Sequence, residues 1–157
     1  MRGRLGFSAV ELMIAMAIIG ILVGLGAVLV RRPAVRVLSN EFRMQIVQAR
    51  FEAVERNRPV AVTWDGETRT LSTRVNLDDP LVGAACDGQA IRSHAGSSAY
   101  RDVTISGTFA SIVFLPNGQA RKCDGSAIGA SDSTLQISDS RRTVTIAVTS
   151  AGRIVVQ

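Results

Sequence analysis

Few side chains in this 157-residue chain are of the types that carry out enzymatic chemistry. The single histidine, His94, lies near Ser93 and Ser97 in a stretch that we predict to be a loop, where a lone histidine is usually solvated. Asp78 and Asp79 adjoin a proline and indicate a turn. The sequence contains neither a phosphate-binding loop nor a GxGxxG pattern. We therefore predict no enzymatic activity and expect no cofactor or metal.

The two cysteines, Cys86 and Cys123, are the other reactive side chains. With one histidine in the whole chain they lack the ligands for a zinc site. We predict a disulfide bond between them, which implies an oxidising compartment such as the periplasm. A pair of buried free thiols is the alternative.

One carboxylate, Glu11, interrupts an otherwise apolar stretch from Phe7 to Val30. The part from Leu12 to Val30 carries no charge and meets the length of roughly 20 residues that a membrane-spanning helix needs. An ionised carboxylate inside hydrocarbon is expensive, so such a residue usually has a partner and a function. The alternative is a side chain that reaches the membrane interface near the helix start, where the dipole favours an anion.

The residues before the apolar stretch carry a more specific signal. Arg2 and Arg4 precede Gly6, which is followed at once by Phe7 and, four residues later, by Glu11. This pattern resembles the N-terminal signal of type IV prepilins and type II secretion pseudopilins. The resemblance implies that a prepilin peptidase cleaves after Gly6 and methylates Phe7. It also implies that Glu11 meets the new N-terminal amine of a neighbouring subunit during assembly.

A second helical pattern follows, from residue 31 to residue 58, with two apolar stripes. One stripe is expected to cover a sheet. The other either faces a neighbouring subunit or is buried on a second side of the same domain. The helix should end near Asn57, because the residue before Pro59 avoids the helical region. The first stripe consists of Val35, Leu38, Phe42, Ile46, Ala49 and Ala53, and the second of Met44, Val47, Phe51 and Val54.

From Pro59 onward the period is that of strands, and Asp65-Gly66 is a hairpin signal. Segments 76–90 and 124–133 are rich in Gly, Asp, Ser and Ala and are predicted to be loops. Short, closely spaced strands predict a small antiparallel sandwich of two sheets. The expected strands are 60–64, 68–75, 103–106, 111–115, 119–123, 134–138, 143–149 and 153–156.

Three segments, 48–60, 114–118 and Gly152-Arg153, resemble the GspH/FimT family of minor pilins and pseudopilins. The resemblance implies an α+β fold in which a long N-terminal transmembrane and amphipathic helix is packed on a small antiparallel two-sheet β domain, as in the lollipop shape of pilins. The corresponding division is a leader peptide at 1–6, a transmembrane and assembly helix at 7–30, its amphipathic continuation at 31–58 and a periplasmic β domain at 59–157.

The function that this resemblance implies is that of a minor type IV pilin, and the alternative is the H-type pseudopilin of a type II secretion system. Either would be a single-pass inner-membrane protein with a periplasmic C-terminal domain before it joins a pilus or pseudopilus. The expected partners are the prepilin peptidase, the inner membrane and other pilins, bound through the N-terminal helix. Arginines at 31, 32, 36 and 43 favour the opposite orientation on a positive-inside count, but the leader signal is more specific.

The chain has a formal net charge of +5, and Lys122 is the only lysine among its 18 basic residues. This excess permits contact with nucleic acid without requiring it. Some family members capture DNA through basic residues near the chain end, so DNA is a further candidate partner. The alternative is a solvated turn whose charges protect a sheet edge. The candidate DNA-binding residues are Arg141, Arg142 and Arg153, with Arg121 and Lys122 on a nearby turn.

Overall fold

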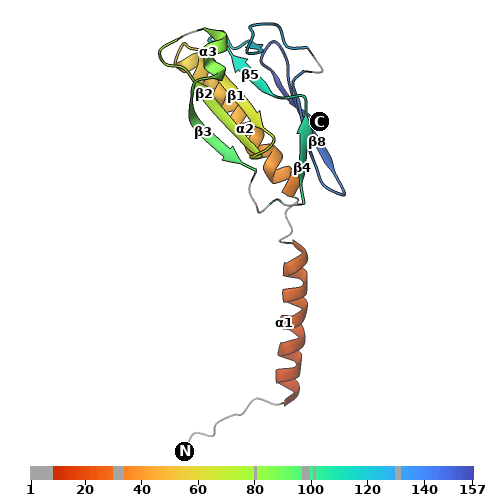
Figure 1. The fold of residues 1–157 in the computed structure, drawn as a ribbon. Helices are drawn as coiled ribbons and strands as arrows, with labels where there is room; N and C mark the ends of the chain where they lie inside the picture. The colour runs from red at the N-terminus through yellow and green to blue at the C-terminus, as the bar shows by residue number, and fades with distance from the viewer. Residues whose placement is uncertain (1–8, 30–33, 80, 97–99, 101, 130–131) are drawn as a thin grey trace, which may run out of the picture. The chain divides into compact units, whose positions relative to one another are not determined.

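The computed structural model of the chain describes residues 9–29, 34–79, 81–96, 100, 102–129 and 132–157 (Figure 1). The chain divides into two compact units, 1–33 and 34–157. The predicted cleavage site, Gly6 and Phe7, lies outside the described residues, as does Pro33.

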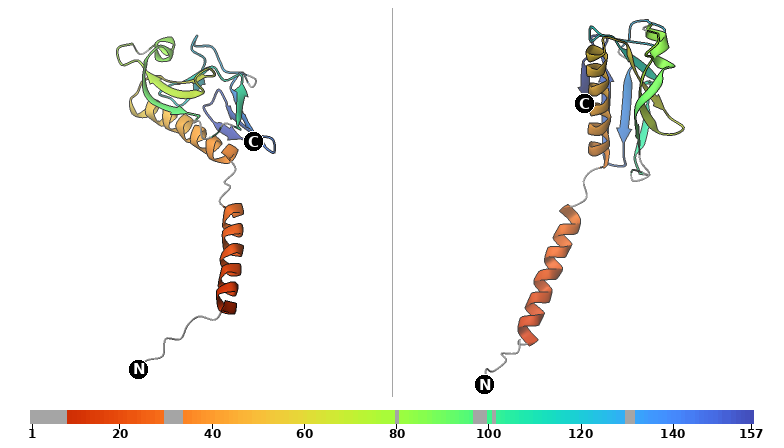
Figure 2. Two further views of the ribbon diagram at one scale, coloured as in Figure 1. Left: turned by 60° about the horizontal axis from the view of Figure 1, so that its bottom comes forward. Right: turned by 90° about the vertical axis from the view of Figure 1, so that its left-hand side faces the viewer.

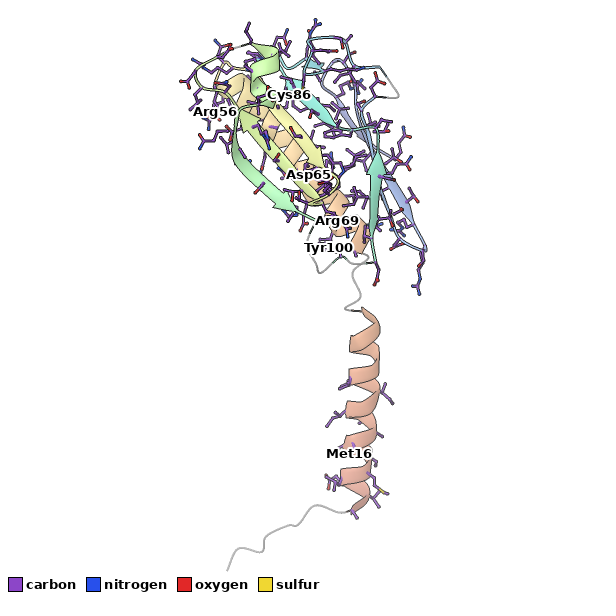
Figure 3. The ribbon with its side chains drawn as sticks, in the orientation of Figure 1. Met16, Arg56, Asp65, Arg69, Cys86 and Tyr100 are labelled. Atoms are coloured by element: carbon purple, nitrogen blue, oxygen red, sulfur yellow. A yellow bond between two sulfur atoms is a disulfide. The ribbon has the colours of Figure 1, made fainter. Side chains whose placement is uncertain are left out.

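The first unit contains helix α1 (Ala9–Leu29), so the helical state expected for the apolar stretch is confirmed. Glu11 lies in the first turn, where the positive end of the helix dipole favours a carboxylate. Large apolar side chains such as Met16, labelled in Figure 3, are more than half exposed within this unit. No helix within the described ranges reaches the combination of length and apolarity that crossing a bilayer requires.

The second unit begins with helix α2 (Ala34–Glu55), and its first apolar stripe is completely buried, as predicted. Beyond Glu55, Asn57 adopts a left-handed conformation with φ of 51°, which ends the helix close to the predicted place. The amide of Arg58 still donates to the carbonyl of Ala53, at 3.2 Å. The chain then enters the first strand through Pro59.

Two antiparallel sheets complete the second unit, which confirms the predicted sandwich of strands behind a helix (Figure 2). In spatial order the first sheet consists of β3 (Gln89–Ala95), β2 (Thr70–Val75), β1 (Val60–Asp65), β5 (Ser111–Phe114) and β6 (Ala120–Arg121). The second consists of β4 (Thr104–Gly107), β7 (Thr134–Ser138), β8 (Thr143–Val148) and β9 (Ile154–Val156).

One hydrophobic core joins α2 to both sheets. Phe42, at the centre of the buried stripe, has its ring centroid 5.6 Å from that of Trp64 on β1. Buried Gln45 donates through Nε2 to the carbonyl of Leu71 on β2, at 2.9 Å. This hydrogen bond satisfies the buried amide nitrogen of Gln45 and connects the helix to β2.

Two elements contradict the sequence-based assignment. Residues 76–90 were expected to form a loop, but they include the short helix α3 (Val82–Cys86) and the start of β3. His94 was expected in a loop and lies in β3 instead. Six of the seven β3 residues are exposed, so this edge strand lacks the alternating apolar pattern that identifies a half-buried strand. A register shift opposite Thr73 and Arg74 obscures it further.

The predicted β1–β2 hairpin is present, although its loop is longer than a two-residue Asp-Gly turn. The carboxylate of Asp65 accepts hydrogen bonds from the amide of Glu67, at 2.9 Å, and from the hydroxyl of Thr68, at 2.7 Å. The hydrogen bond from the Thr68 hydroxyl is the main cause that lowers the pKa of Asp65 below its ordinary value. Arg69 leaves the loop with φ of 53° and donates to the carbonyl of Val103 (Figure 3).

Two phenylalanines on α2 provide a matched test of this packing. Phe42→Ala should lower the free energy of unfolding by about 3–5 kcal/mol, because it leaves a cavity against both sheets. Phe51→Ala, at a side chain that is 69% exposed, should change it by less than about 1 kcal/mol. Urea unfolding followed by the fluorescence of Trp64 and by circular dichroism measures both. Equal losses would show that the two faces of α2 are misassigned.

Candidate functional site

The exposed side of α2 carries the second apolar stripe, which we call the α2 ridge. Met44 is 57% exposed, Phe51 69% and Val54 51%, and Val47 is half-buried. Of the two alternatives for this stripe, burial on a second side of the same domain is therefore wrong. The ridge faces away from the core and is available to a partner or to solvent.

A groove of about 330 Å³ runs between the ridge and β3. Across it, His94 Nε2 lies 2.9 Å from a carboxylate oxygen of Glu41, and Arg92 donates to the side-chain carbonyl of Gln48 at 2.6 Å. Arg92 also lies 3.7 Å from the Glu52 carboxylate. These side chains connect the exposed strand β3 to the helix. Sequence reasoning missed them, because nothing in the sequence indicates that β3 lies beside α2.

On its other side the ridge borders a groove of about 460 Å³, lined by Phe51, the turn at residues 116–118 and Ile154. Here the guanidinium of Arg50 covers two glycines in left-handed conformations, Gly118 with φ of 80° and Gly152 with φ of 72°. A Cβ on Gly152 would lie 1.9 Å from the carbonyl oxygen of Gly118, so the two turns approach too closely for a side chain there. The three segments that resemble the GspH/FimT family therefore meet at one place.

The predicted disulfide between Cys86 and Cys123 is present, with the two Cα atoms 6.0 Å apart. It fastens α3, labelled at Cys86 in Figure 3, to the segment that follows β6. Beneath it lies a second, smaller apolar cluster formed by Ala61, Ala85 and Val113. The bond therefore holds the loop after β2 on the outer face of the first sheet.

The five candidate DNA-binding residues do not form one patch. Arg141 and Arg142 lie in the β7–β8 turn, where one carboxylate oxygen of Asp139 accepts both of their amides at 2.8 Å. Arg153 precedes β9 and lies at the opposite end of β8, about 20 Å away for a strand of this length. Strand β8, which separates them, is labelled in Figure 1.

The other two candidates are on the Arg153 side but already have partners. The amide of Ala120 donates to the carbonyl of Ser150, which brings β6 beside the β8–β9 turn. Arg121 donates to the carbonyl of Gly125, at 3.0 Å. Lys122 lies 2.7 Å from the Asp132 carboxylate, and this hydrogen bond raises the pKa of Lys122 above its ordinary value. Both side chains are therefore less available to a phosphate than the exposed arginines.

Comparison with known structures gives the class of fold. The fold matches the type IV minor pilin FimU of Pseudomonas aeruginosa PAO1, with 17% identity, coverage of 78% of this chain and 91% of that chain, and a TM-score of 0.53. It also matches the minor pseudopilin EpsH from the type 2 secretion system of Vibrio cholerae, with 12% identity, coverage of 78% and 94%, and a TM-score of 0.56. The architecture is that of minor pilins and pseudopilins.

The family follows from the sequence match. The family model described as "Type II transport protein GspH" matches residues 38–152, which is most of the second unit. The chain belongs to this family, as its resemblance to GspH/FimT proteins predicted. A search of curated proteins finds no match.

Removing the disulfide tests its contribution to the β domain. Replacing both Cys86 and Cys123 with serine should lower the free energy of unfolding by about 3–4 kcal/mol, because the open chain gains conformational entropy when it unfolds. Reducing the unmodified protein should give the same loss, which controls for effects of the serines. Alkylation and mass measurement of the native protein should find no free thiol. Two alkylatable thiols in unreduced protein would contradict the assignment.

Proposed function

We propose that the chain is a minor type IV pilin that a prepilin peptidase processes and that then joins or primes a pilus. The family match over the second unit supports a pilin or pseudopilin, and the structural match to the type IV minor pilin FimU is the observation that carries the choice of a pilus. The N-terminal pattern supports it, because α1 places a single carboxylate, Glu11, in the first turn of an apolar helix. Residues 7–30 are proposed to hold the unassembled subunit in the inner membrane, with the β domain in the periplasm.

The chemistry of assembly follows from cleavage after Gly6. The cut creates a cationic amine at Phe7, four residues before Glu11 in the sequence. The Glu11 carboxylate is costly in hydrocarbon unless a cation neutralises it. When helices pack side by side, the amine of a neighbouring subunit can neutralise it. The carboxylate therefore destabilises the membrane-embedded monomer and favours the assembled state. The disulfide between Cys86 and Cys123 is consistent with folding in an oxidising periplasm.

The second candidate is a minor pseudopilin of a type II secretion system. The description of the matching family and the structural match to EpsH support it. Both roles use the same fold, processing and helix. Deleting the host's type IV pilus machinery or its type II secretion machinery distinguishes the two roles. The chain should disappear from filaments only when the machinery to which it belongs is deleted.

DNA binding is a narrower candidate within the pilin role. It is supported by the exposed side chains of Arg141, Arg142 and Arg153, which form no ion pair within the described part of the chain. Because these arginines lie at the two ends of β8, a bound strand would have to extend along the second sheet to reach them all. Arginine suits such phosphate contacts.

Replacing Glu11 with alanine tests the proposed function. Incorporation into filaments should fall by roughly tenfold or more, because the neighbouring amine loses its carboxylate partner in a medium of low dielectric. Membrane insertion should be unchanged or improved. Glu67→Ala, which removes an exposed carboxylate from the β1–β2 loop, is the matched control. Immunoblots of sheared filaments and membranes measure the distribution.

Filaments that contain the unmodified protein also test whether the leader peptide is cleaved. Mass measurement should find a chain that begins with methylated Phe7. An intact leader, or cleavage after Ala27, would refute the processing step. Normal incorporation of the Glu11→Ala protein would show instead that Glu11 only reaches the membrane interface.

Gel-shift titration of residues 34–157 tests DNA binding. We expect a sequence-independent shift at low salt that weakens steeply as salt rises. Arg141→Ala with Arg142→Ala should reduce the logarithmic salt dependence of binding by about 2, and Arg153→Ala by about 1, because each arginine is expected to neutralise one phosphate. No shift at low salt, or an unchanged shift when all three are alanine, would exclude these residues.

A further inference from the structure

The α2 ridge repeats with a period of seven residues. Its members alternate in spacings of three and four, which is the pattern of the a and d positions in a coiled coil. At 100° per residue the centre of the ridge lies about 160° around the helix axis from the buried stripe. The ridge is thus almost opposite to the core. The same spacing continues toward the N-terminus through Val37 and Asn40, so the heptad pattern consists of Val37, Asn40, Met44, Val47, Phe51 and Val54.

Charged residues flank the ridge with the same period and with opposite signs on the two sides. Three arginines, Arg36, Arg43 and Arg50, occupy the positions called g. The opposite flank, at the positions called e, consists of Glu41, Gln48 and Glu55. Over the described ranges, the side chains of Arg36, Arg43 and Glu55 form no hydrogen bond or ion pair.

The charged flanks of one α2 helix are complementary to those of a second copy in one orientation of the two helices. In a parallel pair of helices, each g residue faces the e residue five positions later on the other helix. We propose that a second copy of this chain docks on the α2 ridge, with the two α2 helices parallel and in register. Arg36 then faces the second copy's Glu41, Arg43 its Gln48 and Arg50 its Glu55. An antiparallel pair would set the arginines against each other and is disfavoured.

The surroundings of the helix leave room for this arrangement. The two grooves, of about 330 and 460 Å³, border the ridge on its acidic and basic sides respectively. The groove on the basic side can receive the acidic flank of the partner helix. In the groove on the acidic side, the partner's arginines would replace the contacts of His94 with Glu41 and of Arg92 with Gln48. Asn40, at a d position, would favour the register that sets it opposite the second copy's Asn40, because a buried polar side chain needs a polar partner. The mixture of an apolar ridge with both signs of charge favours a protein helix over a nucleic acid as the occupant.

This inference extends the proposed function by naming a partner for the exposed face of α2. It can fail independently, because self-association is measured on purified protein and filament incorporation in cells. A purified protein that does not self-associate, together with normal incorporation, would leave the pilin proposal intact.

Charge reversal on the two flanks tests the pairing. The full chain in detergent micelles is compared by sedimentation equilibrium as the original protein, Arg50→Glu and Glu55→Arg. Each single variant should dimerise roughly tenfold more weakly, because two attractive pairs become two repulsive ones. An equimolar mixture of the two variants should recover the original affinity within about threefold, because each then faces an opposite charge. Gln48→Glu should tighten the dimer by about two- to threefold, since it adds a charge opposite Arg43.

Cross-linking tests the register. Phe51→Cys should form a disulfide with the same residue of the second copy under mild oxidation, whereas Gln136→Cys, exposed on β7, should not. Trp64 fluorescence confirms that each variant is folded. A monomeric original protein, charge variants with unchanged affinity, or equal cross-linking at residues 51 and 136 would each overturn the proposal. Cross-linking of residue 51 to a different pilin alone would also overturn it and identify a different occupant.

Discussion

The buried stripe of α2 is the contact on which the rest of the second unit depends. Its side chains fill the space against both sheets, and Phe42 connects the helix to β1 through Trp64. Burial of one face determines what the opposite face can do. Because this stripe faces the sheets and Gln45 bonds to β2 from the same side of the helix, the apolar side chains of Phe51 and Val54 are left outside the core. A helix that only completed a domain would carry polar residues there.

A second constraint lies at the turns that contact α2. Gly152 approaches the Gly118 carbonyl so closely that it accepts no side chain, and Arg50 covers both glycines. This approach joins the first sheet, the second sheet and the helix at one end of the domain. The disulfide from Cys86 acts on a different face and holds the segment around α3. The domain is therefore stabilised by its core, by the close approach of the two glycine turns and by the disulfide. The core and the glycine turns also hold α2, the helix that carries the ridge, in place.

The sequence predicted the elements whose burial is periodic. The α2 stripe, the β1–β2 hairpin and strands β7 and β8 show clear periods, so their positions were correct to within two residues. Strand β3 and helix α3 were missed because one is exposed along most of its length and the other lies among small and polar residues. The partner of His94 could not be inferred without β3. The placement of distant charges was equally beyond the sequence, because Arg141 and Arg153 are close in number but lie at opposite ends of the six-residue strand β8.

The two helices use charge in different ways because they are proposed to work in different media. In hydrocarbon a single carboxylate such as Glu11 has a large effect, since it is costly until a counter-ion such as a neighbour's amine neutralises it. In water the charged flanks of α2 contribute little affinity, because solvent screens each pair. Their value is orientation, since like charges disfavour every arrangement except the one that sets Arg50 opposite a carboxylate. In this account Glu11 favours association of subunits, and the flanks of α2 select how two copies align.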